Sequence, residues 1–214
     1  MRKPVLEIPL FPLPSLAHFP GHVLPLHVFE PRYRALMRDA LKGDARFAMA
    51  VFRPGWEPHY EERPPIFDVV TIGSITKYKK LPDGRYVLHL LGVTRARVEE
   101  EREGKPYRIG RVTLLEEAPL AASEEPKRRR EVVAALRGLC GDEVRVPREA
   151  SAIGLVDAAT LGLPLCIERK MEIYSTCCHA ERIASFVGAV RDVLARKDAM
   201  QQTIKNKPED PSLN

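Results

Sequence analysis

Residues 19–41, FPGHVLPLHVFEPRYRALMRDAL, constrain the fold of this chain more than any other segment. A Pro-Gly turn leads into an apolar stretch, 23–29, that is typical of a short strand. Glu30 and Pro31 then begin a helix, since proline is tolerated in the first helical turn, where its missing N–H would have no intrahelical partner. Helical spacing predicts one core-packed face, formed by Tyr33, Leu36, Met37 and Leu41. The segment therefore predicts a turn, a strand and a helix in direct succession.

The rest of the first half, to residue 118, is rich in strand patterns. The predicted strands are residues 47–52, 69–80, 85–93, 94–101 and 107–116. Pro82-Asp83-Gly84 joins two of them as a hairpin, because glycine can supply the positive φ that such a turn requires. Several strands with short turns and one early helix predict an α+β fold that opens with a twisted, partly closed β-barrel or a pair of packed sheets.

The second half changes to helical periodicity. Apolar faces with helical spacing begin at Val132, Ile153, Ile167 and Ile183. A linker-like composition at 117–123 separates the halves, so we predict three parts: a β-rich domain at 1–118, a helical bundle at 119–197 and a polar tail at 198–214. The tail composition predicts disorder.

Composition indicates a globular protein, with 44% hydrophobic and 29% charged residues among 214 and a net charge of +5. No stretch approaches the roughly 20 apolar residues of a membrane span, and the N-terminus lacks a secretory pattern. We expect a cytoplasmic protein with no membrane partner. The four cysteines are Cys140, Cys166, Cys177 and Cys178. We expect them to be reduced, since no secretion signal accompanies them.

The loop at 53–67 is the most informative stretch outside the predicted core. It is roughly 15 residues long, a length that indicates either a functional or a disordered segment. It contains the only tryptophan, Trp56, together with Tyr60 and Phe67. Aromatic side chains on a proline-rich loop can hold an extended peptide, since they offer large apolar area with few torsions to freeze. The alternative is that Trp56 and Phe67 only pin the loop to the barrel.

Sequence motifs for catalysis are missing from the chain. It contains no GxxxxGK[ST] loop, GxSxG or HExxH motif. His18, His22 and His27 have a spacing that could hold a metal on one helix, but Pro20 and other breakers interrupt that helix. We therefore expect no enzyme activity, no catalytic residue, no cofactor and no metal, and we expect His27 to be a structural hydrogen-bonding residue.

Several segments, taken in order, resemble the N-terminal, substrate-binding domain of Lon proteases. Besides 19–41, the similar segments are 7–13, 69–75, 81–86, 91–98 and 107–117. The similarity continues in the helical half and covers about residues 5–195. The resemblance implies a PUA-like barrel followed by a helical subdomain. Full-length Lon proteins also carry an ATPase and a Ser-Lys protease domain, and this chain lacks their motifs.

The resemblance implies a non-catalytic module that captures unfolded or tagged polypeptides, or a partner protein, and that can self-associate. Our candidate contacts are Phe19, His22, Trp56, Tyr60 and Phe67. An RNA-binding module is an alternative, because some PUA-type barrels bind RNA. Nucleic acid is disfavoured, however, since cations alternate with acids and no basic-aromatic stripe is evident. A small-molecule site is a further alternative, but in a distant relative it belongs to a zinc-binding domain with paired CxxC motifs, which are missing here.

Overall fold

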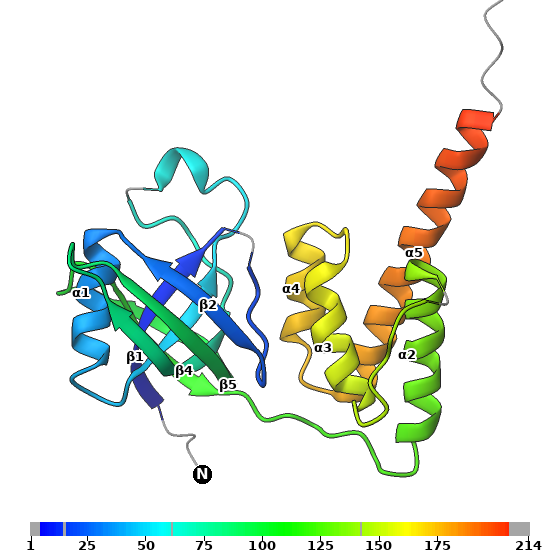
Figure 1. Ribbon diagram of the computed structural model, residues 1–214, viewed down its shortest axis with the longest axis horizontal. Helices are drawn as coiled ribbons and strands as arrows, with labels where there is room; N and C mark the ends of the chain where they lie inside the picture. The colour runs from blue at the N-terminus through cyan, green and yellow to red at the C-terminus, as the bar shows by residue number, and fades with distance from the viewer. Residues whose placement is uncertain (1–4, 15, 61, 142, 206–214) are drawn as a thin grey trace, which may run out of the picture. The chain divides into compact units, whose positions relative to one another are not determined.

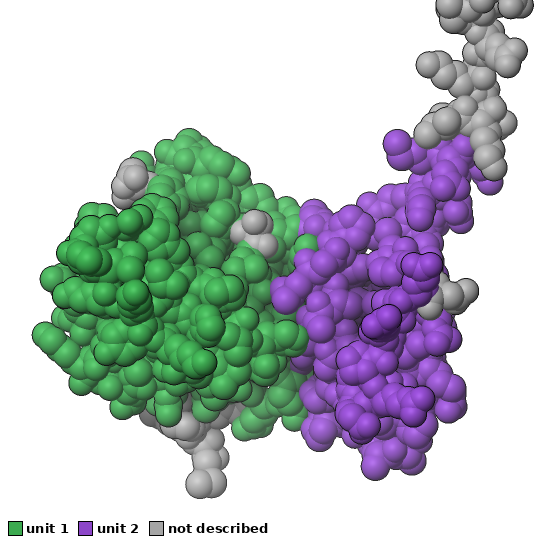
Figure 2. All heavy atoms as spheres, in the orientation of Figure 1, with its two compact units in different colours: residues 1–117, 167–177 green, residues 118–166, 178–214 purple. Residues whose placement is uncertain are grey.

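The computed structural model describes residues 5–14, 16–60, 62–141 and 143–205 (Figure 1). The chain divides into two compact units (Figure 2). The first consists of residues 1–117 and 167–177, and the second of 118–166 and 178–214. The named strands all lie in the first unit. In the described part of the chain no helix is long and apolar enough to cross a membrane.

Six strands form one sheet, and the overall class is α+β as predicted. They are β1 (Val5–Leu13), β2 (Val23–Val28), β3 (Arg46–Val51), β4 (Val69–Lys80), β5 (Tyr86–Arg102) and β6 (Arg108–Leu114). Their order is β2-β5-β4-β3-β1-β6, and β5 also pairs with β6. Among the described pairings of these six strands, β1–β3 alone is parallel. The β4–β5 hairpin turns where predicted, with Gly84 at φ +83°.

One strand prediction was wrong, because 85–93 and 94–101 form the single strand β5 rather than two. Gly92, near the predicted break, continues the strand and serves a different purpose. A Cβ at this position would clash with the carbonyl oxygen of Phe19. Glycine is therefore required at position 92 for close backbone approach, not for a turn.

Helix α1 (Pro31–Ala40) has proline in its first turn, as predicted. Its side chains Tyr33, Leu36 and Met37 are buried in the main core of the first unit. They share that core with Phe11, Phe47, Tyr86, Leu88 and Leu90. Burying a side chain of this size stabilises the fold by about 1.5–3 kcal/mol. The core thus fixes α1 against the sheet and places its first turn next to the loop at 53–67.

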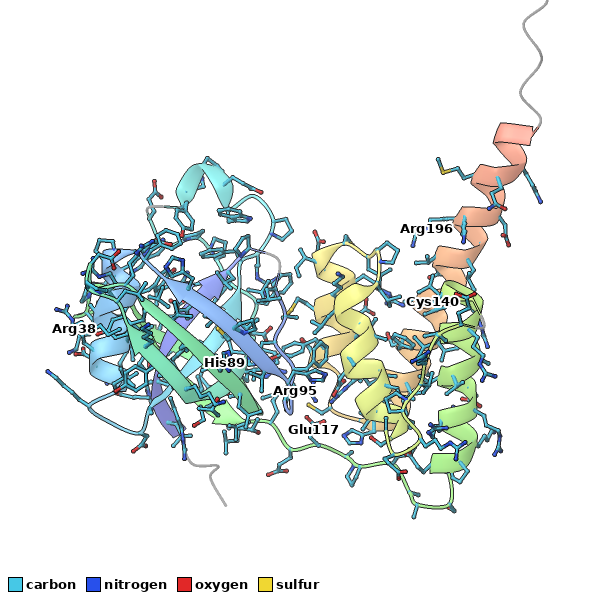
Figure 3. All side chains as sticks on the ribbon, in the orientation of Figure 1. Arg38, His89, Arg95, Glu117, Cys140 and Arg196 are labelled. Carbon is cyan, nitrogen blue, oxygen red and sulfur yellow. The ribbon has the colours of Figure 1, made fainter. Side chains whose placement is uncertain are left out.

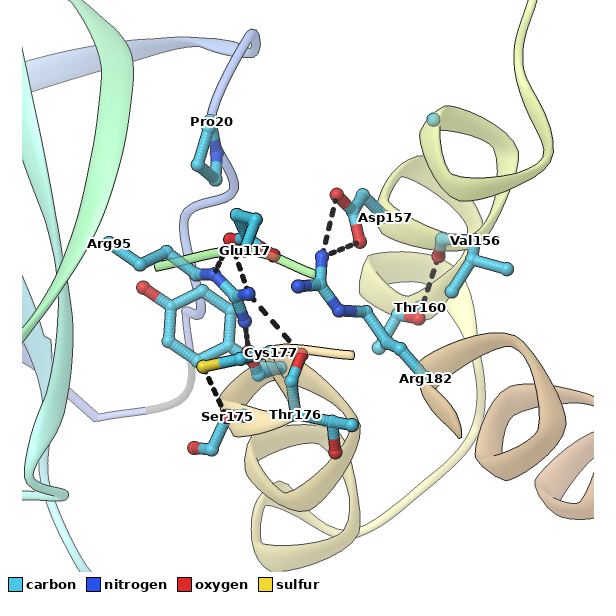
Figure 4. Close-up of polar contacts among 12 residues, drawn as sticks. Pro20, Arg95, Glu117, Val156, Asp157, Thr160, Ser175, Thr176, Cys177 and Arg182 are labelled. Atoms are coloured by element: carbon cyan, nitrogen blue, oxygen red, sulfur yellow. Dashed lines mark hydrogen bonds and ion pairs between the residues drawn. The ribbon is translucent and has the colours of Figure 1, made fainter. Parts of the chain in front are cut away.

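Helix α4 (Ile167–Ser175) belongs to the first unit, although it lies within the range 119–197 that we predicted as one helical subdomain. The hydroxyl of Tyr174 lies 2.5 Å from that of Thr71, and its ring meets Phe19 edge-on, with ring centres 4.9 Å apart. Arg95, on β5, donates to the carbonyl oxygens of Tyr174 and Thr176 and to the carboxylate of Glu117 (Figure 4). A cation at the C-terminal end of a helix is favourable, and it ties α4 to the sheet.

The second unit consists of α2 (Glu125–Cys140), α3 (Ala152–Gly162) and α5 (His179–Lys205), which contact one another pairwise. Ser151 caps α3 by accepting from the amide of Gly154. Arg182 and Asp157 form a buried ion pair, with Nη1 3.1 Å from Oδ1 (Figure 4). Residues 198–205, which we expected in a disordered tail, continue α5, and the rest of that tail lies outside the described residues. The four cysteines are free.

His18 makes the stability of the first unit depend on pH. The ring is buried, its Nε2 lies 2.9 Å from the carbonyl oxygen of His22, and its Nδ1 has no partner within the described part of the chain. Burial lowers the pKa of His18 below its ordinary value. Below about pH 6.5 the unfolded chain therefore binds more protons than the folded chain. As a result, the free energy of unfolding falls as pH decreases, by at most about 1.4 kcal/mol per pH unit.

We expect His18→Gln to flatten this pH dependence between pH 7 and 5, measured by urea unfolding at several pH values. His89→Gln is the matched control, because His89 is exposed on the sheet (Figure 3) and should leave the slope unchanged. Equal slopes in His18→Gln and the unsubstituted protein would contradict the assignment.

Candidate functional site

The loop at 53–67 is an ordered structure in the residues described. It contains a short 3-10 helix, η1 (Glu57–His59), and its two ends are tied together by backbone hydrogen bonds. The amide of Arg53 donates to the carbonyl oxygen of Pro65, and the amide of Phe67 donates to that of Val51, both at 2.9 Å. The loop therefore holds its aromatic side chains in fixed positions.

Three aromatic rings form what we call the aromatic platform: Phe52, Trp56 and Tyr60. Trp56 stacks on Phe52 with ring centres 5.4 Å apart and an interplanar angle of 15°. Tyr60 meets Trp56 edge-on at 5.6 Å. Phe52 is buried, whereas Trp56 and Tyr60 keep part of their surface exposed. The two exposed rings therefore both pin the loop and remain accessible.

The first turn of α1 anchors the platform. The hydroxyl of Tyr60 donates to Oε1 of Glu30 at 2.5 Å, and Nε of Arg32 donates to Oε2 of the same carboxylate at 2.9 Å. The guanidinium carbon of Arg32 lies 4.7 Å from the ring centre of Tyr60 and 4.9 Å from that of Tyr33. Burial, and then the hydrogen bond to Glu30, raise the pKa of Tyr60. These contacts hold Tyr60 as a neutral, oriented hydrogen-bonding ring.

Two hollows adjoin the platform, because Phe52 lines both. The first hollow, of about 420 Å³, is lined by Pro12, Arg32, Tyr33, Phe52, Glu62, Arg63, Pro64, Lys105, Pro106, Tyr107 and Arg108. The second hollow, of about 330 Å³, is lined by Pro14, Phe52, Pro54, Gly55, Trp56, Glu57 and Ile167. Of the two partly exposed rings, Trp56 lines the second hollow, and Tyr60 lines neither.

The cations of the first hollow already have carboxylate partners outside its lining. Lys105 lies 3.0 Å from Asp39, and Arg108 pairs with Glu101. Arg32 pairs with Glu30 in the same way. The first hollow therefore does not demand an anion, and its walls suit a polar, uncharged group such as a peptide backbone.

The structure separates the five candidate contacts. Trp56 and Tyr60 lie together on the platform. Phe67 lies beneath the guanidinium of Arg53, whose central carbon is 4.8 Å from the centre of the Phe67 ring. His22 lines neither hollow, and its Nδ1 lies 3.2 Å from the carbonyl oxygen of Pro20. Phe19 has no exposed surface in this structure.

Sequence reasoning missed Phe52, Glu30 and Arg32 as parts of this site. The sequence pattern places Phe52 in a strand and predicts Glu30 only as the start of a helix. The chain brings them together from segments about 20–30 residues apart, which periodicity cannot reveal. The prediction for His27 was also wrong, because this side chain is exposed beside Phe29, with ring centres 5.9 Å apart. Among the described residues no group of three or more His, Cys, Asp or Glu side chains is arranged to hold a metal ion.

These features define an α+β domain with an aromatic platform on an ordered surface loop. The family model of the ATP-dependent protease La (LON) substrate-binding domain matches residues 7–203, and the chain belongs to this family. Two solved structures are similar. A Lon N-terminal domain protein from Xanthomonas campestris is 24% identical, with a TM-score of 0.63 over 86% of this chain and 98% of that one. The N-terminal domain of a Mycobacterium avium complex Lon protease is 17% identical, with a TM-score of 0.64 over 87% of this chain and 99% of that one.

Curated relatives are longer than this chain. Lon protease 2 of Myxococcus xanthus is 25% identical over 213 residues, which cover 92% of this chain and 25% of the relative. Lon protease of Trichlorobacter lovleyi is 31% identical over 118 residues, which cover 55% of this chain and 14% of the relative. The chain thus spans about a quarter or less of the relatives it matches.

Proposed function

We propose that this chain is a non-catalytic module that binds extended, apolar polypeptide segments at the aromatic platform. The observation that carries the proposal is the combination of Trp56 and Tyr60: the two rings meet edge-on, both remain partly exposed, and two hollows adjoin the platform through Phe52. The family to which the chain belongs is named for substrate binding in a protease, so its substrates are polypeptides.

The chemistry of the platform fits such a client. Rigid aromatic rings provide apolar contact area at a low cost in conformational entropy. The first hollow offers donors and acceptors to the backbone, and the second offers prolines. A client side chain of Leu or Phe would lie on Trp56 while the flanking backbone enters the hollows.

The architecture that we propose for this module is a PUA-like, partly closed barrel followed by a helical bundle. The pairing of β5 with both β4 and β6 supports the barrel, because it lets the row of strands return on itself. The mutual contacts of α2, α3 and α5 support the bundle. We also propose that the module neither hydrolyses nucleotide nor cleaves its client, which incubation with ATP and casein would test.

Trp56→Ala is expected to weaken binding of a fluorescein-labelled peptide rich in Leu and Phe by about tenfold. Truncating an interface tryptophan typically costs more than 1 kcal/mol, and 1.4 kcal/mol is a tenfold change. Fluorescence anisotropy would measure the affinity. In the unsubstituted protein, binding should also shift the emission of Trp56, the only tryptophan in the chain.

Tyr78→Ala is the matched control, because Tyr78 is an exposed aromatic residue of the same unit that lines neither hollow. We expect its affinity to match that of the unsubstituted protein. Equal affinities in Trp56→Ala and Tyr78→Ala, or no binding by the unsubstituted protein, would overturn the proposal. Thermal unfolding separates this proposal from the alternative that Trp56 only pins the loop. That alternative predicts that Trp56→Ala lowers stability while the folded fraction keeps its affinity for the peptide.

A further inference from the structure

A third hollow, of about 310 Å³, lies where α1 meets the β4–β5 hairpin. It is lined by Pro31, Arg34, Arg38, Lys80, Gly84 and Tyr86. Three of these six residues are cations, and no carboxylate is among them. Neither hollow beside the aromatic platform has this composition. The third hollow is therefore a separate feature that peptide binding at Trp56 does not use.

The three cations have no ion-pair partner within the described part of the chain, in contrast to the cations of the first hollow. The acid nearest in sequence to Lys80 and Gly84 is Asp83, at the hairpin turn. Its carboxylate accepts from the amide of Arg85 at 3.0 Å and from Nε of the same residue at 2.6 Å. Asp83 also interacts electrostatically with Arg34, but it does not line the third hollow, whose lining keeps a net positive charge that a ligand can meet.

The cations are held close together by the fold. Arg34 and Arg38 are four residues apart on α1 and therefore share one helix face. Gly84 has φ +83°, and a Cβ at this position would clash with the guanidinium of Arg34, so that this side chain packs against the hairpin turn. Figure 3 shows Arg38 at the outer side of α1. Lys80, at the end of β4, completes the group.

We propose that the third hollow binds the carboxylates of an acidic polypeptide segment. Arginine presents a planar fork of donors that matches a carboxylate with two parallel hydrogen bonds, and charge-assisted bonds of this kind are stronger than neutral ones. This proposal rests on the proposed function, since it names a second feature of the same class of client: acidic residues near an apolar segment.

A nucleic-acid backbone fits the charge distribution less well. Lys77 and Lys79 also lie on β4, but side chains alternate between the two faces of a strand. They therefore point to the opposite face from Lys80 and do not line the third hollow. Three converging cations suit one or two carboxylates, whereas a nucleic-acid site requires a continuous basic track along the phosphates.

The test uses two labelled peptides, one with a block of six glutamates and one with glutamines in their place, and measures anisotropy at low salt. We expect Arg34→Gln/Arg38→Gln to weaken binding of the glutamate peptide by about five- to thirtyfold, as expected for the loss of two partly exposed charge pairs. The glutamine peptide should bind the unsubstituted protein at least as weakly as the glutamate peptide binds Arg34→Gln/Arg38→Gln. The control is Arg130→Gln/Arg191→Gln, which removes the same charge from two exposed sites in the second unit and should bind like the unsubstituted protein.

Equally weakened binding of the glutamate peptide in both double variants would overturn the proposal, because the effect would then come from net charge alone. A single-stranded oligonucleotide that binds more tightly than the glutamate peptide, and loses more affinity in Arg34→Gln/Arg38→Gln, would overturn it in favour of nucleic acid. The apolar peptide separates the two proposals: if it binds in a Trp56-dependent manner while the glutamate peptide does not bind, only the acidic site fails. Circular dichroism confirms that each variant is folded.

Discussion

Replacing Arg95 by alanine is expected to lower the free energy of unfolding by about 3–5 kcal/mol, one of the two largest effects of a single substitution that we expect in this chain. The side chain of Arg95 is fully buried, with 0% of its surface exposed. It donates to the carbonyl oxygens of Tyr174 and Thr176 and to the carboxylate of Glu117. Alanine would leave these acceptors without the guanidinium and would open a cavity in the space that it fills.

Urea unfolding followed by far-UV circular dichroism would measure this loss. Arg97→Ala is the matched control, two residues along β5, because its ion pair with Asp68 is about half exposed on both sides, at 44% and 46%. An exposed pair contributes about 0–1 kcal/mol, so the control should unfold almost like the unsubstituted protein. Similar losses for Arg95→Ala and Arg97→Ala would show that Arg95 does not tie α4 to the sheet.

Asp157→Ala is expected to destabilise the second unit by about 3–5 kcal/mol, because it takes the carboxylate away from a buried ion pair while the charge of Arg182 stays buried. Arg182 is only 2% exposed, and both oxygens of Asp157 lie within 3.3 Å of its Nη1. The pair links the first turn of α5 to α3, so we expect the loss in the urea transition of the helical unit.

A double substitution isolates the cause of this effect. Asp157→Ala/Arg182→Met removes both charges and keeps apolar volume, and replacing a buried pair by packed apolar groups is often neutral or stabilising. We therefore expect the double variant to recover most of the stability lost in Asp157→Ala. A double variant as unstable as the single one would indicate that lost packing, not the loss of the carboxylate beside Arg182, causes the effect.

The two stability predictions concern residues that do not line the proposed binding surfaces. Arg95 and Asp157 line none of the three hollows. Variants at Trp56 or at Arg34 and Arg38 should therefore change affinity with little change in the urea midpoint, whereas variants at Arg95 and Asp157 should show the reverse pattern.

Local patterns in the sequence predicted most of the elements correctly. The turn at 82–84, the helix that begins at Pro31 and the helices of the second half all rest on short-range signals: glycine at a positive φ, proline in a first turn, and apolar residues with helical spacing. Such signals depend on a residue and its close neighbours in the chain. The single long strand β5 replaces the two strands predicted at 85–93 and 94–101, and the close approach of Gly92 to Phe19 within it joins distant segments that local patterns do not connect.

The sequence by itself determined the family, the α+β class and the presence of aromatic residues on a long loop. Only the tertiary structure decided which of the candidate aromatic residues are accessible: Trp56 and Tyr60 keep part of their surface exposed, whereas Phe19 is fully buried. It also decided that Arg34, Arg38 and Lys80 surround one hollow and that a buried Arg95 attaches α4 to the sheet. The physical reason is that burial and ion pairing depend on contacts between segments far apart in the chain, and periodicity within one segment carries no information about them.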